Sequence, residues 1–317
     1  MSAFFKIFKE SREFFMLAGI LFQITAGIVW IGAGAVISHA AKKGLSLDFI
    51  QGVSALIIMA LTLPIFFFSS TEMHAFSLAA LVLSGIVNYI CFIVAQKAMA
   101  KGPSGLTWAM MQSSFVMPFL MGICFFNVPC SPVRLTGLGV LLLSMFMMGK
   151  WGVTAQEGEE SEKKEHSRKS VWLFFTLLAF LVAGSSQCLC NLSSYFIKES
   201  SAAGLDAIYF RAGVNSTGPF LVFLLSPLWN KNSLRGKGTL GCIIMLTICT
   251  LITVGFLFAG LDTLAACGAG AIAYPVSLGS SIAGFLVYTA IRLKERLSLP
   301  ALGGVILCFA GIVLLAF

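Results

Sequence analysis

Charged residues are scarce in this chain. They make up 11% of the 317 positions, while hydrophobic residues make up 58% and the mean hydropathy is +0.94. A soluble domain needs roughly a quarter of its residues charged to cover its surface. The composition therefore excludes a soluble globular protein and predicts a surface that faces lipid.

Acidic residues and histidines are especially few, with 13 and 3 copies respectively. All of them lie between the apolar stretches or close to their ends. Membrane proteins that bind protons or cations use carboxylates embedded within helices. The sequence therefore argues against coupling through a buried acid, and no proton relay can be assembled from these histidines.

Motifs for nucleotide, metal or acyl chemistry do not occur. The sequence contains no Walker A, zinc-ligand, dinucleotide-binding or nucleophile-elbow pattern. We therefore expect no catalytic residue, no metal and no cofactor, and we do not expect an enzyme. The net charge of +8 comes from basic residues that stand singly or in pairs beside apolar stretches. Anchoring at lipid headgroups explains that pattern better than nucleic-acid binding.

Apolar stretches long enough to cross a bilayer recur along the whole chain. A hydrocarbon core of about 30 Å needs about 20 such residues per helix. The fold class expected is an all-α membrane protein with ten transmembrane helices. The stretches are 14–39, 49–70, 75–97, 105–126, 133–151, 171–197, 206–228, 238–261, 268–292 and 299–317.

A polar segment, 152–170, divides these stretches five and five. Its composition is mixed in charge and shows no apolar periodicity, which predicts a solvated linker without a fold of its own. The flanking units are 1–151 and 171–317. TGLGVLLLSMFMMG (136–149) closes the first and LGGVILCFAGIVLL (302–315) closes the second. An odd number of helices per repeat inverts the second copy, as in many secondary transporters.

A family resemblance rests on the end of each half. LKERLSLPALGGVILCFAGIVLL (293–315) resembles the closing signature of EamA-like members of the drug/metabolite transporter superfamily, and SGLTWAMMQSSFVMPF (104–119) also fits that family. The chain departs from the pattern at Cys130, where a glutamate is usual, and at Pro275. The resemblance implies a ten-helix secondary transporter of two inverted repeats, and it says little about the substrate.

Polar side chains within the apolar stretches are the candidates for substrate binding. They could bind substrate in a central path, or they could form hydrogen bonds between helices, and the sequence leaves both interpretations open. Arg211 is the one strong charge inside a predicted helix. We expect it to extend to the headgroups, with substrate binding as the alternative, and Asp206 lies close enough in sequence for a local ion pair. The candidates are Gln23, Asn88, Gln112, Gln187, Asn215, Tyr274, Ser277 and Ser280.

The function expected from these observations is secondary transport of a small organic metabolite, such as an amino acid, by alternating access. The rivals are a multidrug exporter and, less favoured, a membrane enzyme acting on lipid-linked substrates. We expect the lipid bilayer and a small solute as partners, a homodimer as an option, and the inner membrane of a bacterium as the location. Orientation stays open, because the Lys and Arg distribution places the termini outside and the resemblance places them inside.

Overall fold

The structure is a computed structural model, and it describes residues 2–68, 74–126, 131–151, 162–195, 205–226, 236, 238–267, 272–295 and 297–316. These residues are almost entirely helical and contain no strand. The helices of the first half are α1 (Ser2–Lys43), α2 (Leu47–Phe68), α3 (Ala75–Met99), α4 (Ser104–Gln112), the 3-10 turn η1 (Ser113–Phe115), α5 (Val116–Phe126) and α6 (Pro132–Trp151). Those of the second half are α7 (Glu162–Tyr195), α8 (Leu205–Leu225), α9 (Thr239–Ala266), α10 (Ala273–Arg292) and α11 (Leu299–Ala316).

The chain is an all-α membrane protein. Six helical segments in the described residues are long and apolar enough to cross a bilayer, namely those in α1, α3, α4–α5, α7, α9 and α10. Shorter apolar helices lie in α2, α6 and α11. Large apolar side chains point outward, as at Phe68, which is 88% exposed, and this is expected where the neighbour is lipid rather than water. The helix α8 is less apolar because it carries Asp206, Arg211 and Asn215.

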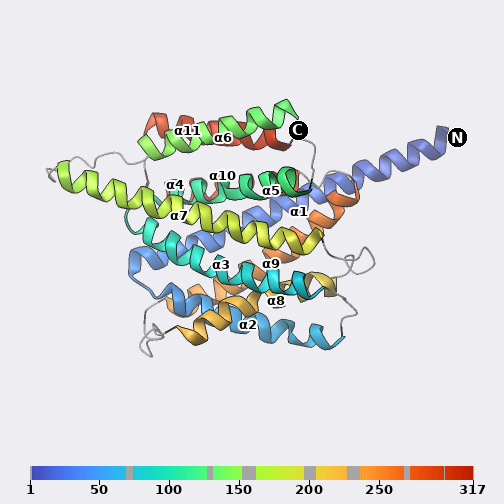
Figure 1. Cartoon of the computed structure of the whole chain (residues 1–317), viewed down its shortest axis with the longest axis horizontal. Helices are drawn as coiled ribbons and strands as arrows, with labels where there is room; N and C mark the ends of the chain where they lie inside the picture. The colour runs from blue at the N-terminus through green and yellow to red at the C-terminus, as the bar shows by residue number, and fades with distance from the viewer. Residues whose placement is uncertain are drawn as a thin grey trace.

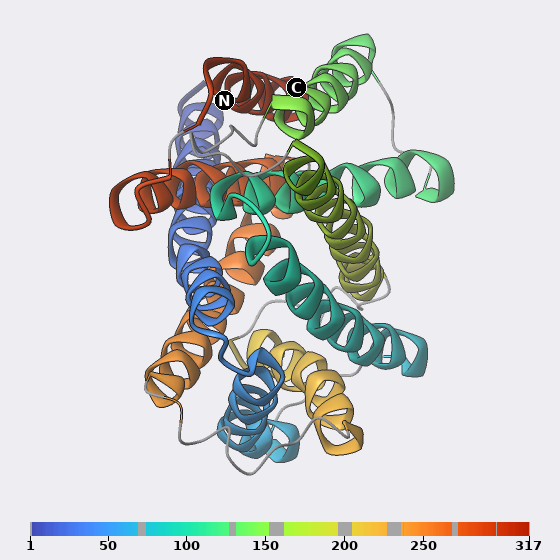
Figure 2. The ribbon, with the colours of Figure 1, turned by 90° about the vertical axis from the view of Figure 1, so that its left-hand side faces the viewer.

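The helices are arranged as stacked layers. Figure 1 shows α6 beside α11 at one end of the stack and α2 beside α8 at the other. The pair of α10 and α4–α5 lies next to α6 and α11, and α1, α3, α7 and α9 lie in the middle. Seen from the end in Figure 2, α1 and α9 stand on one side while α3 and α7 stand on the other. The start of α1 and the end of α11 lie on the same side of the molecule.

Two helices begin earlier than the sequence predicted. The first starts at Ser2 instead of residue 14, and α7 starts at Glu162 instead of residue 171. The expectation that 152–170 has no fold is therefore wrong for 162–170, and 152–161 lies outside the described residues. The segment 162–169 is rich in Glu, Lys and Arg, which are good helix formers. Extending an existing helix needs no new nucleation, so a polar sequence continues α7 at little cost.

Two contiguous apolar clusters make up the core. One includes residues of α1, α2, α3, α4, α7, α8, α9 and α10, among them Phe49 and Phe223, and the other is built mainly from α4, α6, α10 and α11. Trp108 belongs to the first cluster, with its ring centroid 5.1 Å from that of Phe285. Because α4 and α10 contribute to this contact, it connects the two halves of the chain at the centre of the stack.

Candidate functional site

A break in the helix α4–η1–α5 lies close to the middle of its length. Pro118 has no N–H, so the carbonyl of Ser114 loses its ordinary helical partner. Ser113 Oγ meanwhile donates to the carbonyl of Ala109 at 2.8 Å, a bond that competes with the regular ladder. The backbone adopts a 3-10 turn over Ser113–Phe115 instead. Within this turn the Ser114 carbonyl accepts a backbone N–H. Transporters commonly place substrate sites at irregular turns of membrane helices.

Gln187 of α7 reaches this break. Its Nε2 donates to Ser114 Oγ at 3.0 Å, and its Oε1 is buried with no hydrogen-bond partner among the residues that the structure describes. Gln112, at the end of α4, is only 3% exposed, and its Nε2 likewise has no partner. Buried amide groups are normally satisfied, so atoms left over in this way mark a place where water or a ligand can bind. The structure therefore brings Gln112 and Gln187 to one region.

The helices α3 and α7 meet beside this region through a pair of serines. Ser84 Oγ donates to the carbonyl of Ser186 at 2.9 Å, and Ser186 Oγ donates to the carbonyl of Ser84 at 3.0 Å. Both hydroxyls are buried and both are used within the protein. These serines hold two helices together and position the neighbouring Gln187, so they act in packing.

Gln23 and Asn215 each bind a carbonyl on another helix. Gln23 Nε2 donates to the carbonyl of Leu257 in α9 at 2.9 Å, and Asn215 Nδ2 donates to that of Leu81 in α3 at 3.0 Å. These bonds are the helix-to-helix contacts that the packing interpretation predicts. Gln23 Oε1 is nevertheless buried without a partner in the described part of the chain. Gln23 therefore combines a packing bond with an open acceptor.

The other four candidates are more dispersed. Asn88 is half-buried in α3, and Tyr274 packs beside the cluster of α4, α6, α10 and α11. Ser277 and Ser280 of α10 lie against Gly27 of α1, and Ser280 Oγ donates to its own helix at Val276. The two serines therefore mark a close approach of α10 to α1.

Arg211 differs most from its prediction. Its side chain is only 1% exposed and lies against α9, so it does not extend to the headgroups. Its Nη2 is 3.2 Å from the Asp262 carboxylate, and its guanidinium carbon is 4.0 Å from the centroid of the Phe258 ring. The sequence considered only the local Asp206 as a partner. Asp262 lies 51 positions later in the sequence, and only the fold identifies it as the partner of Arg211.

A second carboxylate, Asp48, is buried at the start of α2. It accepts a hydrogen bond from the Tyr89 hydroxyl and one from Ser226 Oγ at 3.3 Å. Its exposed fraction is 8%. The sequence placed Asp48 correctly at a helix end but gave no signal that α3 and α8 would cover it. This group connects α2, α3 and α8 at the end of the molecule where α2 begins.

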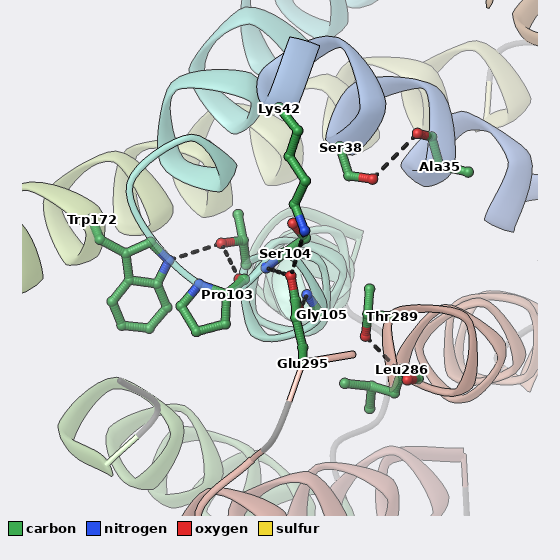
Figure 3. Close-up of polar contacts among 11 residues, drawn as sticks. Ala35, Ser38, Lys42, Pro103, Ser104, Gly105, Trp172, Leu286, Thr289 and Glu295 are labelled. Atoms are coloured by element: carbon green, nitrogen blue, oxygen red, sulfur yellow. Dashed lines mark hydrogen bonds and ion pairs between the residues drawn. The ribbon is translucent and has the colours of Figure 1, made fainter. Parts of the chain in front are cut away.

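Glu295 connects three elements at that same end. Figure 3 shows its carboxylate directed at the first turn of α4. It accepts from the backbone N–H of Ser104 and from that of Gly105, each at 3.0 Å, and lies 3.5 Å from Lys42 Nζ. The unpaired N–H groups and the dipole of a helix start favour such a carboxylate. These contacts connect the residues after α10 to the start of α4 and the end of α1.

Comparison of the chain with protein-family models and with curated proteins finds no match.

Proposed function

We propose that the chain is a secondary transporter of a small organic metabolite, built from ten transmembrane helices in two inverted five-helix repeats. In this proposal it belongs to the EamA-like branch of the drug/metabolite transporters and acts in the inner membrane of a bacterium. Each repeat contributes five membrane segments, with α4–α5 counted as one. The single observation that supports the proposal is the pattern of helix contacts.

That pattern repeats when the two halves are exchanged. The helix α1 packs along α9, and its counterpart α7 packs along α3, the counterpart of α9. Likewise α1 packs on α10, and the matching contact is that of α7 with α4 and α5. The helix α2 packs on α9, and the matching contact is that of α8 with α3. Three further contacts join counterparts to each other: α2 with α8, α4 with α10, and α6 with α11. A two-fold axis between two copies of one unit would produce this set of contacts.

Five helices per repeat give the two copies opposite directions through the membrane. Inverted repeats of this kind support alternating access, because each repeat can adopt the conformation of the other. The broken helix supports the same interpretation, since Gln112 and Ser114 lie halfway along α4–α5 and next to Gln187 of the other repeat. Substrate bound at this junction would be accessible from either side in turn.

The polar groups at the junction favour an uncharged or zwitterionic part of the substrate. Among the described residues, the atoms without partners at the junction are an amide N–H₂ on Gln112 and an amide oxygen on Gln187, and an amide oxygen on Gln23, which packs against α9, is likewise without one. Such a set donates to a carbonyl or carboxylate and accepts from a hydroxyl or ammonium group. A metabolite such as an amino acid carries both kinds of group, so the proposal names that class first.

The test is flux in proteoliposomes that contain the purified full chain. Vesicles are loaded with amino acids, organic acids, sugars or nucleosides. The exchange of each solute for the same radiolabelled solute outside is then measured against protein-free vesicles. We expect saturable exchange for at least one solute. We expect Gln112→Leu and Gln187→Leu each to raise the half-saturation concentration of that solute about tenfold, because each removes one buried hydrogen bond to it. Gln96→Leu is the control, because Gln96 bonds to Leu45 outside the junction. Flux equal to that of empty vesicles for every solute, with folded protein present, would contradict the proposal.

A further inference from the structure

The Arg211 guanidinium is an uncommon group for this position. It lies in the second turn of α8, about 9 Å from the helix start at a rise of 1.5 Å per residue. Its side chain is 1% exposed, although a charge within a membrane helix is costly. The helices α8 and α9 pack on each other, and the pair between Arg211 and Asp262 forms between them. Packing alone would be served better by an apolar side chain, so the cost calls for a function.

Only part of the guanidinium is engaged. Arginine carries five N–H donors in a planar fork. Nε donates to the carbonyl of Ala207 at 3.3 Å, and Nη2 donates to Asp262 Oδ2 at 3.2 Å. Within the described residues, Nη1 makes no hydrogen bond. The Phe258 ring covers one face of the group at 4.0 Å and fixes the plane of the fork. A rigid, buried cation therefore keeps one nitrogen available.

The two members of the pair differ in access. Asp262 is 33% exposed while Arg211 is 1% exposed. Asp262 lies four residues before Ala266, the last residue of α9, about 6 Å of helix rise from that end. A solute that enters from this end of the molecule meets the Asp262 side first. It then reaches the edge of the guanidinium that carries Nη1, and a carboxylate can accept a charge-assisted hydrogen bond from that nitrogen.

We propose that Arg211 binds the carboxylate of the transported metabolite, and that Asp262 is the internal counter-ion that holds the guanidinium when substrate is absent. This inference rests on the proposed transport function and deepens it: the substrate is a small carboxylate-bearing solute, either an amino acid or an organic acid. The amide groups at the helix break then contact the rest of the molecule during passage. Glutamine and serine neighbours alone would not distinguish a carboxylic acid from its amide, whereas a fixed guanidinium does.

Binding is measured by the melting temperature of the purified full chain in detergent, since a ligand of the native state raises it. The probes are sodium acetate, L-alanine and sodium succinate, with acetamide and ethylammonium chloride as matched solutes without a carboxylate. Sodium chloride at equal ionic strength controls for salt. We expect at least one carboxylate to raise the melting temperature in a saturable way while the matched solutes leave it unchanged. Equal shifts by acetamide and acetate would overturn the inference.

Substitutions then locate the effect. We expect Arg211→Lys to weaken carboxylate binding at least tenfold, because lysine keeps the charge and loses the planar fork, and Arg211→Gln to abolish it. Arg292→Gln is the matched control, since Arg292 is an exposed arginine at the end of α10. Carboxylate binding by Arg211→Gln as tight as by the wild type would overturn the inference.

Asp262→Asn tests the role of the counter-ion and remains informative if the arginine variants do not fold. Removing a negative charge next to Arg211 should strengthen carboxylate binding roughly tenfold, by the Coulomb energy of a pair a few ångströms apart. The variant should melt lower than the wild type without ligand and regain most of the difference with saturating carboxylate. If Asp262 is instead a purely structural partner, the variant melts lower and carboxylates do not restore it, which would overturn the inference.

Flux separates this inference from the proposed function. Exchange of neutral or cationic solutes only, with no carboxylate binding, would support transport and reject the role of Arg211. Saturable carboxylate binding without any flux would support the site and reject transport.

Discussion

Glu295 accepts a hydrogen bond from the backbone N–H of Ser104 at 3.0 Å, so a residue of the α10–α11 connection caps the first turn of α4. The two residues are separated by 191 positions in the sequence.

Removing the cap should destabilise the protein. Glu295→Ala leaves the N–H groups of Ser104 and Gly105 without their acceptor, and we expect a loss of about 1 kcal/mol in the free energy of unfolding. Lys42→Ala is the control, because Lys42 is 42% exposed and an exposed ion pair contributes less than about 0.5 kcal/mol. Melting temperatures in detergent compare the two. A larger effect from Lys42→Ala would show that the ion pair, rather than the cap, stabilises this end.

The close approach of α3 and α8 depends on glycine. A Cβ at Gly85 would lie 2.0 Å from the carbonyl oxygen of Asn215, and one at Gly218 would lie 2.2 Å from that of Val82. Because both obstacles are backbone atoms, Gly85→Ala and Gly218→Ala must separate the helices, and we expect losses of about 1–3 kcal/mol. Gly139→Ala in α6 meets nothing within 4 Å and should stabilise by about 0.5–1 kcal/mol. Loss of stability in all three variants would contradict this explanation.

The amide side chains should divide into two classes when replaced by leucine. Asn215→Leu removes the bond to Leu81, and we expect a loss of about 1 kcal/mol with unchanged substrate affinity. Gln112→Leu removes an N–H₂ group that has no partner, so stability should hold or rise while affinity falls. Melting temperature and affinity are measured on the same samples. A stability loss with normal affinity in Gln112→Leu would identify that residue as a packing residue.

Transport should not follow a proton gradient. In the described residues, the acidic side chains that the structure resolves within the bundle are Asp48 and Asp262, and each lies within about a turn of a helix end. Each is also paired, with Tyr89 and Arg211 respectively. We therefore expect flux in liposomes to change less than twofold when an outward or inward pH gradient is imposed. Concentrative uptake that requires the gradient and disappears in Asp48→Asn would show that a buried acid does couple transport.

Much of the helical layout could be predicted from the sequence. Each of the ten apolar stretches contains a helix, because the length of an apolar run and the need to satisfy backbone groups in lipid together permit little else. The boundaries of α1 and α7 were wrong, since helices continue beyond the hydrocarbon region into polar sequence. The 3-10 turn η1 was not predicted, although Pro118 is a residue that disturbs helices, and only the structure showed that Gln187 reaches this turn.

The polar contacts were decided by the tertiary structure. Gln23, Gln187 and Asn215 were chosen as candidates because they lie in apolar stretches, and their hydrogen-bond partners lie 73 to 234 residues away in the sequence. Arg211 shows the limit most clearly. From the hydropathy pattern, Arg211 lies near a helix end and could have reached the headgroups. In the structure α8 packs on α9, and Arg211 pairs with Asp262 instead. Sequence determines which residues cannot face lipid, because transfer of a polar group is costly whatever its neighbours. The packing of the helices determines which hydrogen-bond partner each polar residue has. That choice depends on distances between segments far apart in the sequence, which local sequence patterns do not reveal.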